Sequence, residues 1–453
     1  MKKTVLYTAL LSLAASFVTA SGVLLCIALS KTAAAPDKDG WDMHLMLPQS
    51  ASSAVAVILL VLDIFCVFMA IMLALSYIKS CRAAADADKK ADKPRFSRLT
   101  AIDRGGLPEK TGLPRNERAD LPEFCRGFRS FAATDMGLYY SEEVIRTFIS
   151  AMSCTHLIIL QGISGTGKTS LPFAFGKYVG NDASITPVQP SWKDRSDLLG
   201  YYNEFTDSYT ETELLCSLYK ACLSQDIYTV VLDEMNIARV EYYFAELLSL
   251  LELPEGSSRR VRVTPDSRKS DPRLFENGTL RLPSNVWFVG TANNDDSTLA
   301  VSDKVYDRAF VIELNSRSKS FESDEASKLH ISADRLEELF ADARREHPLS
   351  ENARRGLEKL DAYLTEHVGI TFGNRVMRQA ESFVPVYAAC GGGESEAVDV
   401  LLRNKILYKM DSLNPAICRA EADGIKRCAE SLFGEGELPK SVSYLNKFGT
   451  VEQ

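Results

Sequence analysis

One eight-residue segment limits the possible folds of this chain more than any other. Residues 162–169 read GISGTGKT and match the pattern G-x-x-x-x-G-K-[ST], in which backbone N–H groups surround phosphate groups. The apolar run 156–162 before the motif is typical of a buried strand, and the stretch after it has helical character. A strand, a phosphate-binding loop and a helix in this order predict an α/β core that binds a nucleoside triphosphate.

The residue types in the loop each have a chemical reason. The ammonium of Lys168 would neutralise oxygens of the β- and γ-phosphates, and the hydroxyl of Thr169 would ligate Mg²⁺. The N-terminus of the following helix adds a dipole that favours anions. The predicted nucleotide-binding residues are Gly162, Ser164, Gly165, Thr166, Gly167, Lys168, Thr169 and Ser170.

Two further apolar runs end in polar residues suited to hydrolysis. Residues 229–232 lead into Asp233 and Glu234, the Walker B arrangement. Asp233 would hold Mg²⁺ together with Thr169, and Glu234 would act as the general base that polarises the attacking water. The run that ends at Asn293 would place an amide near the γ-phosphate or that water.

A candidate arginine precedes the last strand of this pattern. Arg308 lies in the run DKVYDRAF, directly before the apolar residues FVIEL. We predict that it reaches the phosphate of a neighbouring subunit. A salt bridge to Asp303 or Asp307 is the alternative interpretation.

These motifs resemble those of the AAA+ ATPases, in the dynein-related, McrB-like branch. The resemblance covers about residues 140–380 and includes Leu-Asp-Glu-Met-Asn, Gly-Thr-Ala-Asn and the segment QPSWKD. It implies a five-stranded parallel αβα core, an all-helical lid and a ring, usually a hexamer. It also implies that Asn293 is sensor 1, that Arg308 is an arginine finger acting in trans, and that Arg375 is sensor 2, with Arg378 as the competitor for that role.

The sequence departs from the McrB pattern at two places. Ser297 stands where the McrB GTPases carry an arginine after the fourth strand, and Ala309 stands where a second arginine is usual. The N-terminal DNA-recognition module of the restriction proteins also has no counterpart. We therefore predict ATP rather than GTP as the nucleotide, although GTP remains an alternative.

Two long apolar runs precede the nucleotide-binding motifs. Residues 4–30 carry no charge, and residues 54–78 carry one, Asp63. Each is long enough for a membrane-spanning helix, and the basic residues after the second predict a cytoplasmic side there. The sequence thus predicts a two-helix hairpin in the lipid bilayer of the cell membrane, with both termini and the ATPase domain cytoplasmic. A cleaved signal peptide is the alternative for the first run.

The expected organisation has four parts. Residues 1–82 would form the hairpin, 83–135 a partly disordered linker, 136–320 the AAA+ core, and 321–453 the helical lid with a C-terminal extension. The net charge of −8 argues against a nucleic-acid coat protein but leaves room for a local basic groove. A nucleic-acid partner is therefore not favoured but stays an alternative.

The leading functional hypothesis is a membrane-anchored ATPase that uses Mg²⁺ and forms a homo-oligomeric ring, probably a hexamer. The ring would remodel or move an unidentified protein substrate. The aromatic pair Tyr201–Tyr202 would either lie near a central pore and grip a polymer, or pack a strand against its helix. A GTP-dependent motor of a DNA restriction system and a nucleotide-switched membrane scaffold are the alternatives.

Overall fold

The computed structural model describes residues 49–92, 94–106, 119–253, 259–293 and 298–449, together with Ala15, Ala20 and residues 22–24. The chain divides into two compact units. The first comprises residues 1–93 with 268–270, and the second comprises 94–267 and 271–453.

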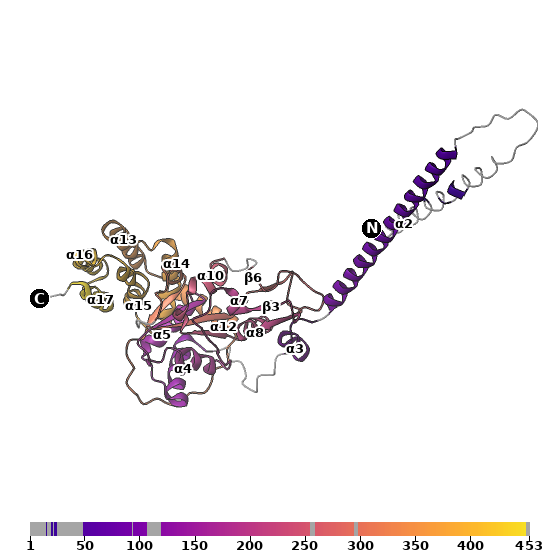
Figure 1. Ribbon diagram of the computed structural model, residues 1–453. Coiled ribbons are helices and arrows are strands. Elements are labelled where there is room, and N and C mark those ends of the chain that lie inside the picture. Colours follow the sequence, from indigo (N-terminus) through magenta and orange to yellow (C-terminus); the bar gives the residue numbers. More distant parts are fainter. Residues whose placement is uncertain are drawn as a thin grey trace, which may run out of the picture. The chain divides into compact units, whose positions relative to one another are not determined.

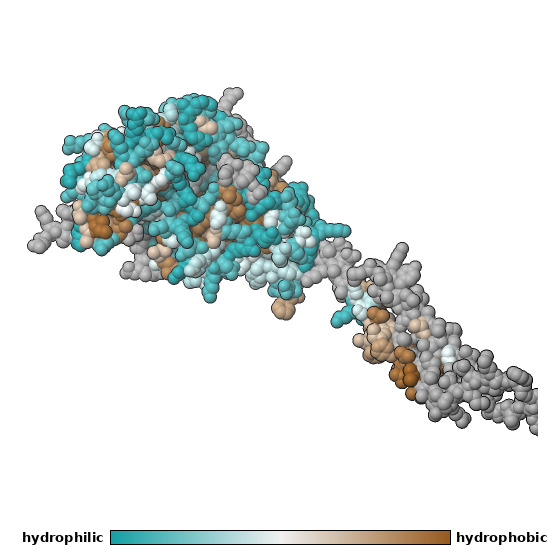
Figure 2. All heavy atoms as spheres, turned by 90° about the horizontal axis from the view of Figure 1, so that it is seen from above, coloured by the Kyte–Doolittle hydropathy of each residue, from teal (hydrophilic) through white to brown (hydrophobic). Residues whose placement is uncertain are grey.

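Helix α2 (Gln49–Asp92) is the main described element of the first unit. Many large apolar side chains along α2 are exposed, among them Val57, Phe65 and Ile71, whereas the visible face of the second unit is mostly hydrophilic (Figure 2).

The predicted membrane location is wrong. A spanning helix must be both long and apolar, and the part of the chain that the structure describes has no helix that meets both requirements. The predicted two-helix transmembrane hairpin, its contact with the lipid bilayer and the multi-pass location are therefore not supported by the described residues. Most of the first predicted span, 4–30, lies outside the described residues.

The second unit contains a five-stranded sheet in the order β2-β5-β8-β1-β9. All four strand pairs are parallel, which confirms the predicted five-stranded parallel core. Because the strands are parallel, their carboxyl ends meet at one edge of the sheet. The strands are β1 (Leu157–Gly162), β2 (Ser184–Pro187), β5 (Tyr228–Asp233), β8 (Val286–Asn293) and β9 (Phe310–Glu313).

Buried side chains of β1 show that helices cover both faces of the sheet. Successive residues of a strand point to opposite faces. Ile158 and Leu160 belong to one hydrophobic cluster, whereas Leu157 and Ile159 belong to the other. The first cluster holds α4 (Leu121–Met136), α5 (Glu142–Met152), α6 (Ser170–Tyr178) and the C-terminal helices. The second holds α3 (Arg98–Gly105), α7 (Arg195–Leu199), α8 (Glu213–Ala221), α9 (Val240–Tyr243), α10 (Ala245–Leu251) and α11 (Asp303–Tyr306).

The C-terminal part is helical, as predicted (Figure 1). Serine side chains start its first two helices, since Ser332 and Ser350 accept hydrogen bonds from backbone N–H groups three residues on. The helices are α12 (Ala333–Glu346), α13 (Glu351–Val368), α14 (Gly373–Ala389), α15 (Glu394–Leu401), α16 (Pro415–Phe433) and α17 (Pro439–Gly449). Between α15 and α16 lie the short turns η2 (Leu402–Ile406) and η3 (Leu407–Ser412).

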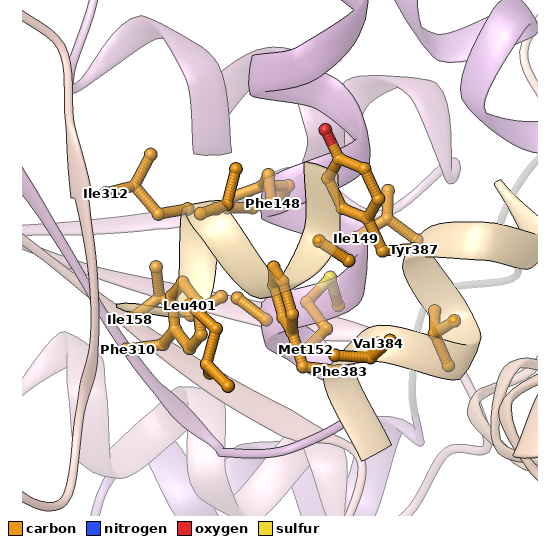
Figure 3. Close-up of a cluster of buried hydrophobic side chains, with 14 of the residues drawn as sticks. Phe148, Ile149, Met152, Ile158, Phe310, Ile312, Phe383, Val384, Tyr387 and Leu401 are labelled. Atoms are coloured by element: carbon orange, nitrogen blue, oxygen red, sulfur yellow. The ribbon is translucent and has the colours of Figure 1, made fainter. Parts of the chain in front are cut away.

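The C-terminal helices share a hydrophobic core with the sheet. Figure 3 shows side chains of α14 and α15 packed against α5, β1 and β9. The rings of Phe310 on β9 and Phe383 on α14 stack with their centroids 4.6 Å apart. Helices α14 and α15 are therefore packed against the core and are not connected to it by the chain alone.

The structure differs from the expected linker over residues 83–135. Helix α3 and all of α4 except its last residue lie in that range, and α4 buries Phe124, Phe128 and Phe131. The ring of Phe128 stacks on Tyr178 of α6 at 5.6 Å between centroids. Residues 107–118 lie outside the described residues.

Two small antiparallel hairpins complete the unit. One pairs β3 (Gly200–Asn203) with β4 (Ser208–Glu211), and the other pairs β6 (Arg260–Arg262) with β7 (Thr279–Arg281). A single-turn 3₁₀ helix, η1 (Met235–Ile237), follows β5.

Candidate active site

The glycine-rich loop connects the carboxyl end of β1 to α6. Its three glycines all have positive φ, at 148° for Gly162, 80° for Gly165 and 92° for Gly167. A Cβ atom at Gly162 would lie 2.3 Å from the carbonyl oxygen of Leu314, so the loop packs against the end of β9 too closely for a side chain. The backbone conformation thus requires glycine where the sequence has it.

Two other loop residues, Thr166 and Lys168, donate hydrogen bonds to carbonyls within the loop. Thr166 Oγ1 donates to the Ile163 carbonyl at 2.9 Å, Ser164 is exposed, and Ser170 is the first residue of α6. Lys168 is buried, and its Nζ donates to the carbonyls of Gly162 at 3.0 Å and Ile163 at 2.7 Å. The ammonium therefore lies within the loop whose backbone amides the motif assigns to phosphate binding.

The side chain of Asp233, at the end of β5, contacts side chains from two other elements. Its Oδ1 accepts hydrogen bonds from Thr169 Oγ1 at 2.7 Å and from Thr291 Oγ1 at 2.9 Å. The hydroxyl of Thr169 and the carboxylate of Asp233 are hard oxygen donors side by side, which is the ligand chemistry that Mg²⁺ prefers. The two predicted metal ligands are thus adjacent, and they fit that ion.

Glu234 has an unusual backbone conformation. Its φ of 53° and ψ of 46° are left-handed, which is uncommon for a residue other than glycine, asparagine or aspartate. The N–H of Glu234 donates to Thr291 Oγ1 at 2.8 Å, and this bond helps to hold the turn. The conformation turns the chain sharply at the end of β5 and leaves Glu234 exposed beside Asp233.

Asn293 lies next to the glycine-rich loop. In the pairing of β1 with β8 it is opposite Gly162. Asn236 fixes its backbone from both sides, because Asn236 Nδ2 donates to the Asn293 carbonyl at 2.9 Å and Asn236 Oδ1 accepts from the Asn293 N–H at 3.3 Å. Asn293 also lines a pocket of about 480 Å³ that continues to Gln161 and Arg403.

The two predicted arginines lie together, but away from this edge. Thr155, two residues before β1, donates to the Arg308 carbonyl at 2.9 Å. The six residues of β1 separate that point from the loop by about 20 Å, at roughly 3.3 Å per residue. Arg308 and Arg375 both pair with the carboxylate of Glu252, whereas Arg378 is exposed. Arg308 makes neither of the alternative salt bridges, to Asp303 or Asp307, among the described ion pairs.

Two residues that the sequence did not suggest hold the loop from outside. The Tyr140 hydroxyl donates to the Gly167 carbonyl at 3.0 Å, and burial raises the pKa of this phenol. Arg317 Nε donates to the Gly165 carbonyl at 2.6 Å. Thr291, Asn236 and Glu252 were likewise given no role, because their partners are distant in the sequence. Asn236 and Thr291 do lie within the segments Leu-Asp-Glu-Met-Asn and Gly-Thr-Ala-Asn, but those segments do not show which contacts the two residues make.

The fold and the loop define an α/β P-loop core with a helical C-terminal part. No protein-family model matches the chain. Over 181 residues it is 24% identical to the EcoKMcrB subunit of a type IV methyl-directed restriction enzyme of Escherichia coli strain K12, a match that covers 38% of each protein. The chain therefore spans well under half of that relative's length, and its similarity to an McrB subunit concerns this stretch.

Two solved structures also match the chain, at lower sequence identity. A putative ATPase from Cytophaga hutchinsonii has a TM-score of 0.44 and 15% identity, over 77% of this chain and 97% of that one. A full-length MCM homolog from Methanopyrus kandleri has a TM-score of 0.35 and 14% identity, over 65% of this chain and 62% of that one.

Proposed function

We propose that this chain is a P-loop nucleoside triphosphatase that hydrolyses ATP with Mg²⁺. The observation that carries the proposal is the cluster of Thr169, Asp233, Thr291 and Glu234 beside the glycine-rich loop. A site that only bound nucleotide would need the loop, but it would not need an exposed carboxylate held in a strained turn beside the metal ligands.

Each residue has a role in this proposal. The loop amides and Lys168 bind the phosphates, and Thr169 with Asp233 holds the ion, which when bound offsets charge on the phosphate oxygens. Glu234 accepts a proton from the attacking water, and the Asn293 amide orients that water or the γ-phosphate. These steps use residues 136–320 as the nucleotide-binding core and 321–453 as its helical lid.

We further propose that the active unit is a homo-oligomeric ring, in which Arg308 acts on the nucleotide of a neighbouring copy. Its backbone lies at the opposite end of β1 from its own loop, too far for its side chain to reach the phosphates there. An arginine in this position needs a second copy to contact a triphosphate. Arg375 pairs with the same carboxylate, so we assign it to the same edge.

The ring would act on a macromolecular partner, for which we propose a protein substrate. The β3–β4 hairpin exposes two aromatic rings, those of Tyr201 and Phe205, while Tyr202 bonds to Asp207. Exposed rings on a short hairpin suit a contact with an extended chain. Replacing Phe205 by Ala should then reduce the stimulation of turnover by a substrate without changing basal turnover.

The full-length protein tests the enzymatic part. ATP and GTP turnover would be measured with Mg²⁺ for the wild type and for Glu234→Gln, with Lys168→Ala as the variant that cannot bind. We expect ATP turnover that Glu234→Gln removes while ATP binding remains. Unchanged turnover in Glu234→Gln would exclude it as the base.

A GTP-dependent motor of a DNA restriction system is the second candidate, and the similarity to an McrB subunit favours it. Preference for GTP, or stimulation of turnover by DNA, would support that candidate instead. Residues 294–297, which include the departure at Ser297, lie outside the described residues and do not bear on the choice.

A further inference from the structure

Glu252 is the residue through which the two remote arginines meet. It directly follows the last residue of α10. Its Oε2 lies 2.7 Å from Arg308 Nη2, and its Oε1 accepts a hydrogen bond from Arg375 Nη2. Both carboxylate oxygens are therefore engaged by guanidinium groups, each in a charge-assisted hydrogen bond.

The three residues come from three separate elements. Glu252 belongs to the end of α10, Arg308 to the segment between α11 and β9, and Arg375 to the first turn of α14 in the helical part. The carboxylate thus joins two parts of the core to the C-terminal helices. This connection lies at the edge where Arg308 is placed, and not at the glycine-rich loop.

The backbone near Arg308 is fixed independently of Glu252. The buried Lys405 Nζ donates to the carbonyls of Tyr306, Asp307 and Ala309 at 2.9, 3.1 and 2.6 Å. Arg308 Nη1 also donates to the Lys304 carbonyl at 2.8 Å. The carboxylate of Glu252 therefore sets the direction of the guanidinium, while the other contacts hold the base of the side chain.

The cluster keeps the charge and the donors that a phosphate requires. Two guanidiniums and one carboxylate leave a net positive charge, and each guanidinium has five N–H donors of which the described bonds use one or two. The side chains of Arg308 and Arg375 are 24% and 45% exposed, so a ligand can reach the cluster.

We propose that Glu252 is a positioning residue that holds Arg308 and Arg375 as one two-arginine anion site for the triphosphate of a second copy of this chain. The inference rests on the proposed function, and it adds a residue to which neither the motifs nor the resemblance assigns a role. Because Arg375 lies on α14, this two-arginine site also depends on the contact between the core and α14.

The primary test is Glu252→Gln in the full-length protein, which keeps the shape of the side chain and removes its charge. Glu246→Gln is the matched control, because Glu246 lies on the same helix and forms a comparable exposed pair with Arg195 at 2.8 Å. We expect kcat for ATP to fall about tenfold or more in Glu252→Gln, since misplaced catalytic groups have effects of that size or larger. KM and Tm should stay close to the wild type, and Glu246→Gln should behave as the wild type.

A double-mutant cycle shows whether the effect passes through the arginine. If Glu252 acts by placing Arg308, then Glu252→Gln has little further effect on kcat in the Arg308→Ala background. Additive losses in kcat would overturn the inference. A wild-type kcat in Glu252→Gln would also overturn the inference. An equal loss of kcat in the Glu246→Gln control would overturn it as well.

Mixing Lys168→Ala, which cannot bind nucleotide, with the impaired Glu252→Gln tests whether the site is donated to a second copy. Lys168→Ala lacks a working loop but keeps its arginines, whereas Glu252→Gln keeps its loop. Mixed oligomers should regain turnover, because intact arginines then complete the Glu252→Gln sites. No recovery, with both variants shown to co-assemble, would refute donation in trans. Absence of turnover in the wild type would instead contradict the proposed function itself.

Discussion

Thr291 offers the sharpest test of how the site is held together. This buried threonine on β8 uses its one hydroxyl twice, donating to Asp233 Oδ1 at 2.9 Å and accepting from the Glu234 N–H at 2.8 Å. Thr291→Val keeps the shape of the side chain but removes both bonds. Neither Asp233 nor Glu234 is itself altered.

The expected cost follows from these two bonds. Loss of a hydrogen bond to a carboxylate costs about 1.5–3 kcal/mol, and a buried N–H without a partner costs about 1–3 kcal/mol. Because the two bonds share one hydroxyl, we expect a combined loss of about 3 kcal/mol rather than the full sum. The left-handed turn at Glu234 also loses a bond that holds it, and a shift of about 1 Å in a catalytic group can reduce rates about 100-fold.

The assay compares kcat, nucleotide affinity and Tm for three variants. Thr291→Val should lower kcat about 100-fold and lower Tm, while ATP affinity changes less because the loop is intact. Thr291→Ser keeps the hydroxyl and should retain most of the wild-type kcat. Thr229→Val makes the same chemical change on β5 at a buried threonine whose hydroxyl has no hydrogen-bond partner in the described part of the chain, so it should be close to neutral.

One result would refute this reasoning directly. If Thr291→Val kept the wild-type kcat and Tm, the hydroxyl would not hold the Walker B residues. If Thr229→Val were as harmful as Thr291→Val, the loss would come from replacing a buried threonine rather than from the two bonds.

Three further predictions concern the loop and the helical part. Tyr140→Phe removes the bond to the Gly167 carbonyl and should weaken ATP binding severalfold, equivalent to about 1 kcal/mol, in a titration; unchanged affinity would show that the bond is dispensable. Gly162→Ala should abolish ATP binding, because its Cβ would lie 2.3 Å from the Leu314 carbonyl, and retained binding would contradict the close packing. Burial lowers the pKa of Lys405 to about 8 from an ordinary 10.5, so between pH 8 and 10.5 Lys405 is protonated only in the unfolded state. As the pH rises through this range, the free energy of unfolding of the wild type should therefore increase by about 3 kcal/mol relative to that of Lys405→Met. A difference in unfolding free energy that does not change with pH would argue against the shift.

The local parts of the site could be predicted from the sequence. The glycine-rich loop, Asp233, Glu234 and Asn293 all follow apolar runs, and parallel strands bring such ends to one edge. Thr291 could not be found this way, because its contact with Asp233 depends on how β5 and β8 align, 58 residues apart in sequence. The partnership of Arg308, Arg375 and Glu252 depends on tertiary packing in the same manner.

The segment 83–135, which the sequence analysis assigns to a linker, is a different case, because it carries a local signal for a helix. Pro108, Pro114 and Pro122 are typical of an irregular segment, yet Pro122 lies in the first turn of α4, where proline is well tolerated. Asp120 caps that helix by accepting from the Glu123 N–H at 2.7 Å. Phe124, Phe128 and Phe131 then recur at helical spacing, which marks a buried face.

The buried Arg95 decides where this protein can be shortened. Its guanidinium, with no exposed side-chain surface, bonds to Asp266, Asp271 and Thr264. A truncated protein that begins near residue 100 would leave the buried Asp271 carboxylate without its counter-ion. One that begins at 136 would also lack the phenylalanines of α4. It would therefore expose the rings of Phe148, Phe175 and Tyr178, on which Phe128 packs. A soluble fragment for crystallisation or kinetics should therefore begin at Pro94, where the second compact unit begins.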